Sequence, residues 1–160
     1  MTADLFESDP ASVGGTRRLG AQALLLHGFA LPWVGALWPA LQAVIAQAPP
    51  RQLLTPGGQR MSAARSNCGA LGWVSDRRGY RYSAQDPDSG RAWPALPASF
   101  LALAGAASAE AGFDGFVPDT CVINRYAVGA RMGLHQDRDE RDLSHPIVSV
   151  SLGVPAVFLW

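Results

Sequence analysis

Consecutive strand candidates in the last third of the chain constrain the fold more than any other feature. Residues 120–126 and 132–136 are candidates, residues 147–152 alternate apolar side chains with Ser at period two, and residues 156–160 begin another. Two helices are predicted before them. Residues 32–47 start near Pro32 and end before Pro49-Pro50, and the Ala-rich residues 97–111 end at Gly112. Helices followed by consecutive strands predict an α+β chain whose second half is antiparallel sheet.

The length of 160 residues predicts a single domain with a real core. We expect residues 1–18, which are polar and contain Gly, to form a flexible tail, and residues 19–160 to form the domain. Residues 21–27 resemble a short strand. Residues 51–91 are rich in Gly, Ser, Asn, Asp and aromatics, which predicts short hairpins and loops, the usual location of recognition surfaces.

Composition narrows the class of protein. Hydrophobic residues make up 48% and charged residues 16% of the chain, as in globular proteins. The 13 acidic residues balance 13 basic ones, so contact with nucleic acid would need a local patch. Every basic residue is Arg, which binds phosphate with two hydrogen bonds where Lys cannot.

Cys68 and Cys121 are predicted to be buried free thiols, rather than a disulfide or a zinc site. The acidic start lacks a secretory signal, and no apolar stretch approaches the length of a membrane span. We therefore expect a soluble, cytoplasmic protein without a membrane partner.

His135 and Asp137 form the strongest candidate for a metal site. Side chains at positions i and i+2 of a strand point to the same face, so this imidazole and carboxylate could bind one ion. That donor set suits Fe(II) in a site with two His and one carboxylate, although a bare His-x-Asp triplet occurs in many unrelated chains. His145 lies between Ser144 and Pro146, where a solvated loop is the expected structure.

Motifs along most of the chain strengthen this interpretation, and together they resemble the bacterial AlkB family. The similarity runs from about residue 51 to residue 158, in a constant order. Its motifs are TPGG (55–58), MS (61–62), NCG (67–69), LGW (71–73), RGY (78–80), YS (82–83), WPA (93–95), PDTCVINRY (118–126), GA (129–130), LHQDRDE (134–140), DL (142–143) and PIVSVSLG (146–153).

The resemblance implies an Fe(II)- and 2-oxoglutarate-dependent dioxygenase that repairs alkylated DNA or RNA by oxidative demethylation. The expected substrates are 1-methyladenine and 3-methylcytosine, especially in single strands, and the products are formaldehyde and succinate from O2 and 2-oxoglutarate. The implied fold is a double-stranded β-helix, or jelly roll, with N-terminal helices. Residues 55–92 would form a nucleotide-recognition lid, and residues 118–160 an incomplete jelly-roll core.

The resemblance also implies roles for particular residues. His135 and Asp137 would be iron ligands, and Asn124 and Tyr126 would hydrogen-bond 2-oxoglutarate. From the residues alone, Asn124 and Tyr126 already alternate onto one face of a predicted strand.

Four substrate contacts follow from the same resemblance. Trp73 would stack on a flipped base, Tyr80 would bind backbone phosphate, and Asp139 would accept a hydrogen bond from the exocyclic amine. Without the resemblance, a solvated turn is the preferred structure for Asp139. Arg65 departs from the apolar residue expected there, and it would add a phosphate contact or alter the choice of base. Arg residues 77, 78 and 81 form either a phosphate-facing ribbon or ordinary surface charge.

The family's third iron ligand, a His, and the arginines that bind 2-oxoglutarate would lie beyond Trp160. We therefore expect a fragment whose C-terminal barrel strands are missing and whose apolar edges are exposed. Three hypotheses remain: a monomeric demethylase with an incomplete sequence, an inactive remnant that only binds single-stranded nucleic acid, and an oxygenase of the same barrel acting on a small molecule or protein. The predicted lid argues against the third.

Overall fold

The computed structural model describes residues 2–4, 14–137, 140 and 142–159. Its helical segments are the 3-10 turn η2 (Leu31–Trp33), α1 (Val34–Gln47) and α2 (Ala98–Glu110). Its strands are β1 (Thr2–Asp4), β2 (Thr16–Gly20), β3 (Ala23–Leu26), β4 (Ala64–Gly69), β5 (Gly72–Asp76), β6 (Gly79–Ser83), β7 (Thr120–Arg125) and β8 (Val157–Leu159).

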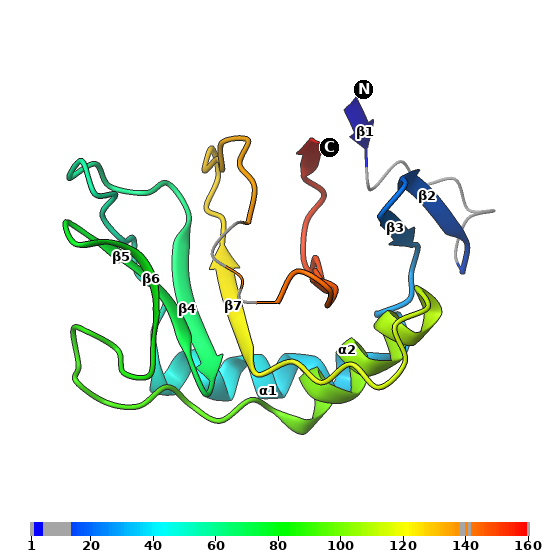
Figure 1. The fold of residues 1–160 in the computed structure, drawn as a ribbon, viewed down its shortest axis with the longest axis horizontal. Coiled ribbons are helices and arrows are strands. Elements are labelled where there is room, and N and C mark those ends of the chain that lie inside the picture. The colour runs from blue at the N-terminus through cyan, green and yellow to red at the C-terminus, as the bar shows by residue number, and fades with distance from the viewer. Residues whose placement is uncertain (1, 5–13, 138–139, 141, 160) are drawn as a thin grey trace.

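The strands of the described residues pair into four two-stranded antiparallel sheets: β1 with β8, β2 with β3, β4 with β7, and β5 with β6. Figure 1 shows α1 and α2 along one edge of the molecule, with the β4–β7 ladder and the β5–β6 hairpin rising from them on one side. The segment that ends in β8, together with β1, β2 and β3, lies on the other side. The result is a mixed α and β structure with few helices.

Both predicted helices are confirmed. The first is split into η2, which contains Pro32, and α1, which ends at Gln47 just before the Pro pair. The second begins after Pro97, whose extended backbone precedes the first turn. Leu37 and Val44 of α1 and Leu103 of α2 are buried, so each helix turns an apolar side toward the interior.

A small core fixes the β5–β6 hairpin on α1. Ala48, Val74 and Trp93 form one buried cluster, and the Trp93 indole Nε1 donates a 2.9 Å hydrogen bond to the carbonyl of Ser83. Gly72 is required beside this ring, because a Cβ at that position would lie 2.3 Å from Trp93 Cε2. The hairpin therefore has a fixed attachment to the body of the domain.

The prediction of strands at residues 132–136 and 147–152 is wrong. Both segments are irregular, because a strand needs a neighbour to complete its backbone hydrogen bonds and no described segment pairs with either one. Residues 156–160 do contain β8. The apolar side chains there are exposed as expected, with Val157 at 68% and Leu159 at 52%.

The N-terminal segment also differs from the predicted tail. Thr16–Gly20 forms β2, which pairs with β3 in a hairpin, and Thr2–Asp4 pairs with β8. The polar composition of β2 hides this strand, because it is short and its first three residues are exposed, whereas the half-buried β3 lies within the strand predicted at residues 21–27. Residues 5–13 lie outside the described residues.

Cys68 and Cys121 lie directly opposite each other in the β4–β7 ladder and are free thiols, as predicted. Cys68 is buried, whereas Cys121 is only half-buried. Among the described residues, no helix has the length and apolar character needed to cross a membrane.

Candidate active site

His135 and Asp137 are brought together in the irregular segment that follows β7. The Nδ1 atom of His135 lies 2.8 Å from the carbonyl oxygen of Gly133, and Nε2 lies 3.5 Å from the Asp137 carboxylate. A neutral imidazole that donates Nδ1–H to that carbonyl would keep Nε2, on the side of Asp137, as the nitrogen that can bind a metal. The backbone therefore presents an imidazole nitrogen and a carboxylate oxygen to one point in space, although the segment is not the predicted strand.

These donors fit part of an iron(II) site. A neutral imidazole and a carboxylate are two of the three protein ligands in the facial arrangement that non-haem Fe(II) oxygenases use. Both side chains remain about half exposed, at 50% and 55%, so solvent and small ligands can reach them. Among the described residues, no group of three or more His, Cys, Asp and Glu side chains is placed to hold a metal.

Asn124 lies at the end of β7, and Tyr126 follows it. Asn124 is the Cα partner of Arg65 across the β4–β7 ladder, so the two side chains share one face of the sheet. Tyr126 comes directly after the strand, and its hydroxyl lies 3.6 Å from the sulfur of Met132. Partial burial raises the pKa of Tyr126, against the opposing effect of the Arg65 charge.

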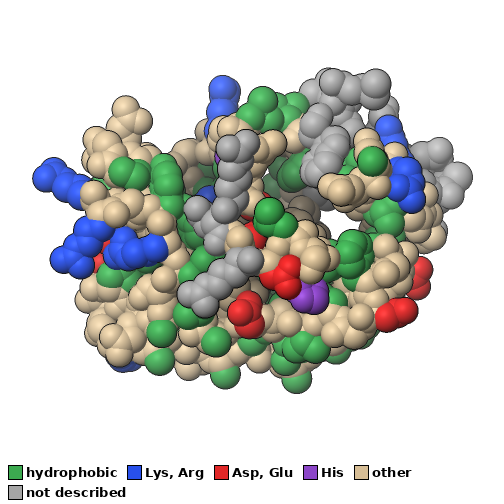
Figure 2. Space-filling model, in the orientation of Figure 1, with side chains coloured by type: hydrophobic (Ala, Val, Ile, Leu, Met, Phe, Trp, Pro, Cys, Tyr) green, Lys and Arg blue, Asp and Glu red, His purple; other side chains and the backbone are tan. Residues whose placement is uncertain are grey.

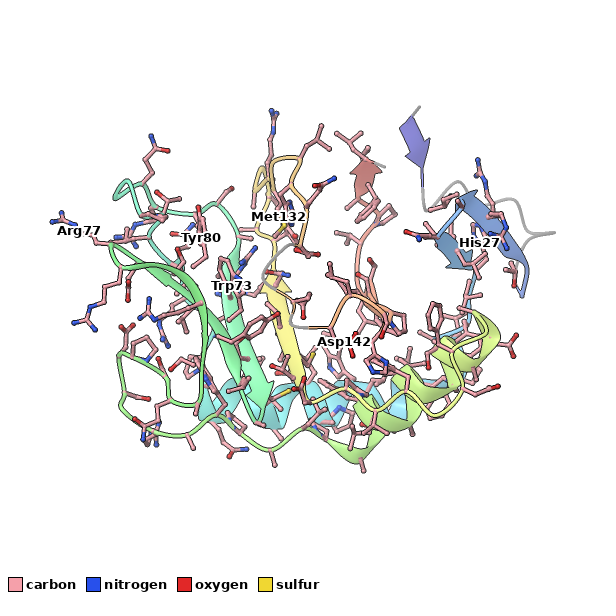
Figure 3. The ribbon with its side chains drawn as sticks, in the orientation of Figure 1. His27, Trp73, Arg77, Tyr80, Met132 and Asp142 are labelled. Carbon is pink, nitrogen blue, oxygen red and sulfur yellow. The ribbon has the colours of Figure 1, made fainter. Side chains whose placement is uncertain are left out.

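Trp73 and Tyr80 form an aromatic pair on the β5–β6 hairpin. Their rings stack with centroids 5.4 Å apart and planes inclined by 20°, and Figure 3 shows them facing the β4–β7 ladder. The Tyr80 side chain is 50% exposed, so its hydroxyl is accessible to a ligand.

Asn67 holds the Trp73 backbone in place, a role that sequence reasoning missed. Its carboxamide oxygen accepts a 3.0 Å hydrogen bond from the Trp73 amide, and its nitrogen donates a 3.1 Å bond to the Trp73 carbonyl. Asn67 is buried at 2% exposure. The signal was a lone Asn in a strand that is otherwise buried, since such an amide must find partners.

Arg65 connects the aromatic pair to the His135–Asp137 segment. Its guanidinium carbon lies 4.2 Å from the Trp73 ring centroid, and one terminal nitrogen lies 3.8 Å from the sulfur of Met132. Burial lowers the pKa of Arg65, while the charges of Tyr126, Asp137 and Tyr80 act in the opposite direction. Met132 is a second residue that sequence reasoning missed, because a thioether carries no motif.

The turn between β5 and β6 carries exposed positive charge. Arg77 and Arg78 are exposed at its tip, and Figure 2 shows basic side chains grouped at that end of the molecule. Arg81 forms an ion pair with Asp76, at 2.7 Å, and therefore does not project into solvent as Arg77 and Arg78 do. Of the predicted three-arginine ribbon, therefore, Arg77 and Arg78 project outward and Arg81 supports the turn.

Tyr82 ties the hairpin to the segment that carries the metal-ligand candidates. Its hydroxyl donates a 2.6 Å hydrogen bond to the carboxylate of Glu140, three residues after Asp137. His145 is exposed, as predicted, and its Nε2 lies 3.5 Å from Asp142. The predicted substrate contact Asp139 lies outside the described residues.

Comparison with known proteins identifies the family of this chain. The family described as the 2OG-Fe(II) oxygenase superfamily matches residues 22–160. The chain belongs to this superfamily. Membership implies a jelly-roll fold, with Fe(II), 2-oxoglutarate and O2 as the reactants that the family name and its chemistry require.

Bacterial relatives confirm the resemblance found in the motifs. The chain is 53% identical over 140 residues to the alpha-ketoglutarate-dependent dioxygenase AlkB of Salmonella typhimurium, covering 88% of this chain and 65% of that protein. It is 51% identical over 140 residues to the protein of the same name from Escherichia coli, with the same coverage. A Caulobacter vibrioides AlkB homolog is 47% identical over 123 residues, which are 77% of this chain and 54% of the homolog. The chain thus spans less than two thirds of the length of these relatives.

Proposed function

We propose that this chain is the substrate-binding and iron-binding part of a dioxygenase that removes N-methyl groups from alkylated bases of DNA or RNA. The observation that carries the proposal is the convergence of His135 Nε2 and Asp137 on one point, with Arg65 linking that segment to the Trp73–Tyr80 pair. An oxidising centre beside an aromatic surface is the arrangement that chemistry on a flipped base requires.

His135 and Asp137 would hold Fe(II), with the Gly133 carbonyl fixing the orientation of the imidazole. Fe(II) held there would supply oxidation of the N-methyl group, with O2 and 2-oxoglutarate consumed and succinate, CO2, formaldehyde and the unmodified base as the products. Asn124 and Tyr126 would bind 2-oxoglutarate from the end of β7, as the resemblance implies.

Residues 55–92, which include the β5–β6 hairpin, would act as the nucleotide-recognition lid. Trp73 would stack on the base, and stacking of this kind contributes roughly 1–3 kcal/mol per base. Tyr80 would contact the backbone phosphate near the base, and Arg77 and Arg78 would contact phosphates further along the strand. Asp139 would accept a hydrogen bond from the exocyclic amine of 1-methyladenine or 3-methylcytosine.

The fold and cellular setting belong to the same proposal. Residues 118–160 would form one part of the jelly-roll core. The protein would act as a monomer in the cytoplasm, on single-stranded or duplex nucleic acid.

The direct test supplies residues 1–160, alone and within any longer product of the same gene, with Fe(II), 2-oxoglutarate, O2 and single-stranded DNA containing 1-methyladenine, and measures formaldehyde. We expect the form that completes the iron site to release formaldehyde, and we expect H135A to abolish that release and H145A to retain it, because His145 is an exposed histidine paired only with Asp142 and Phe116 among the described residues. Formaldehyde release that survives H135A would overturn the assignment of the iron ligand.

A second candidate function is binding of single-stranded nucleic acid without turnover. The exposed Arg77 and Arg78 and the aromatic pair favour it, since they need no metal. Salt-dependent DNA binding by residues 1–160 with no formaldehyde under any metal loading would support this candidate over the first.

A further inference from the structure

Arg65 is a partly buried cation that forms no ion pair with a carboxylate of the described residues, although the charge of Asp137 acts favourably on it from further away. Among the described residues, its buried Nε has no hydrogen-bond partner, and one terminal nitrogen contacts the sulfur of Met132 at 3.8 Å. A thioether is a weak acceptor, so the guanidinium keeps donors that remain unsatisfied. A buried cation in this state strongly favours ligands that bring an oxygen acceptor and disfavours ligands that bring a second positive charge.

The position of Arg65 beside the Trp73 ring favours a nucleic-acid base as that ligand. Its guanidinium carbon lies 4.2 Å from the centroid of the Trp73 ring, the surface on which the proposed function stacks the base. A base that reaches this ring therefore meets the guanidinium at contact distance. Backbone phosphate is a poorer match, because the exposed Arg77 and Arg78 offer it a hydrated surface at the tip of the hairpin, whereas Arg65 is enclosed by Trp73 and Met132.

We infer that Arg65 is a specificity-determining residue that shifts the choice of substrate toward neutral N-methylated bases with a carbonyl beside the methylated nitrogen. This inference rests on the proposed function and refines its substrate class. 1-Methyladenine and 3-methylcytosine are cations with an amino group at that position, while 1-methylguanine and 3-methylthymine are neutral and carry a carbonyl there. Arg65 would repel the cationic bases and find no acceptor on their amino group. It would not repel the neutral bases and could donate a hydrogen bond to their carbonyl.

The test measures equilibrium binding by fluorescence anisotropy, with short single-stranded oligonucleotides that differ only in one base. The quantity of interest is the Kd for 1-methyladenine divided by the Kd for 1-methylguanine. We expect R65M to lower this ratio on the order of tenfold, because two like charges a few ångströms apart in a partly buried site interact by more than thermal energy. 3-Methylcytosine and 3-methylthymine should show the same shift.

Two matched variants separate the possible causes. R17M also removes one positive charge, from the exposed strand β2, and should leave the ratio unchanged. R65K keeps the positive charge but loses the planar set of donors. We therefore expect it to leave the Kd for the cationic base high and to raise the Kd for the neutral base. An unchanged ratio in R65M, or an equal change in R17M, would overturn the inference. Should R65M fail to fold, R65Q is measured in its place against the same criteria.

The binding ratio is independent of turnover. If the ratio shifts as expected and no formaldehyde is released, the proposed function fails and the role of Arg65 in base selection stands. If formaldehyde is released and R65M leaves the ratio unchanged, the proposed function stands and the role of Arg65 is refuted.

Discussion

Asp76 holds the turn of the β5–β6 hairpin and makes it sensitive to acid. Its carboxylate accepts hydrogen bonds from Arg81 at 2.7 and 2.9 Å and from the amide of Arg78 at 2.7 Å. The Arg81 and Arg78 hydrogen bonds lower the pKa of Asp76 from 3.8 to about 2. A carboxylate with a lowered pKa in the folded state stabilises that state above its ordinary pKa, and the contribution disappears as the pH falls through the lowered value.

We therefore predict that the order of the hairpin turn decreases as the pH falls from about 3.8 to about 2. The amide chemical shift of Arg78, followed by NMR, should titrate in that window. D76N should remove this step and leave a turn that is less ordered at neutral pH. A midpoint near 3.8 in the wild-type protein would show that the contacts with Arg81 and Arg78 do not form in solution.

The two thiols of the β4–β7 ladder are predicted to react at different rates. The hydrogen bond between them lowers the pKa of Cys121 and, together with burial, raises the pKa of Cys68 well above its usual range, as expected if the Cys68 thiol is the donor. Because the thiolate is the reactive form, iodoacetamide should modify Cys121 at least about tenfold faster than Cys68. Mass spectrometry of peptides after timed exposure measures both rates. C68A should slow the modification of Cys121, and faster labelling of Cys68 would contradict the direction of the bond.

Single residues with recognisable chemistry could be predicted from the sequence, but their contacts could not. His135 and Asp137 were found from their spacing, and the structure does bring them together. The hydrogen bonds between Asn67 and the Trp73 backbone have no distinctive motif. The contact of Arg65 with Met132 joins segments that are distant in sequence. Their geometry follows from how β4, β5 and the segment after β7 pack, which no local pattern encodes.

Among the elements, Gly72 determines whether β5 can lie against Trp93. A Cβ at Gly72 would lie 2.3 and 2.4 Å from two atoms of the indole and 2.8 Å from Asn67 Cβ, so G72A forces the ring or the strand to move. We predict that G72A lowers the free energy of unfolding by about 1–3 kcal/mol, measured by urea denaturation.

G57A is the matched control for this prediction. A Cβ at Gly57 would meet only Thr55 Oγ1, at 3.8 Å, which is an ordinary contact. Its effect should stay within about 0.5 kcal/mol. Equal effects of G72A and G57A would mean that Trp93 does not pack against β5 as the structure shows.

The elements also mark where sequence patterns suffice. Pro32, Pro97 and Gly112 bound the helices, and such signals act locally, so both helices were predicted correctly. Residues 147–152 alternate as a strand does, yet they are irregular, because alternation reports which side chains share a face and not whether a neighbouring strand is present.

At the scale of the whole molecule, the hairpin and the segment bearing His135 and Asp137 are separate parts that would act on one substrate under the proposed function. The hydrogen bond from Tyr82 to Glu140, at 2.6 Å, and the contact of Arg65 with Met132 join the hairpin side of the domain to that segment. Both contacts cross more than fifty residues of sequence, which is why the motifs alone could not reveal them.

We predict that the Tyr82–Glu140 hydrogen bond orders the segment that carries His135 and Asp137. A hydrogen bond to a carboxylate in a partly buried position contributes about 1 kcal/mol, so Y82F should speed amide hydrogen exchange of residues 132–137 about fivefold. Y80F is the matched control, because it removes a hydroxyl from the same strand without affecting the bond to Glu140. The Y82F and E140A variants, alone and combined, isolate the pair, and we expect a coupling of about 1 kcal/mol. Additive effects of the two substitutions would show that the hairpin and the metal-ligand segment move independently, and the proposed site would then have to be assembled by the substrate.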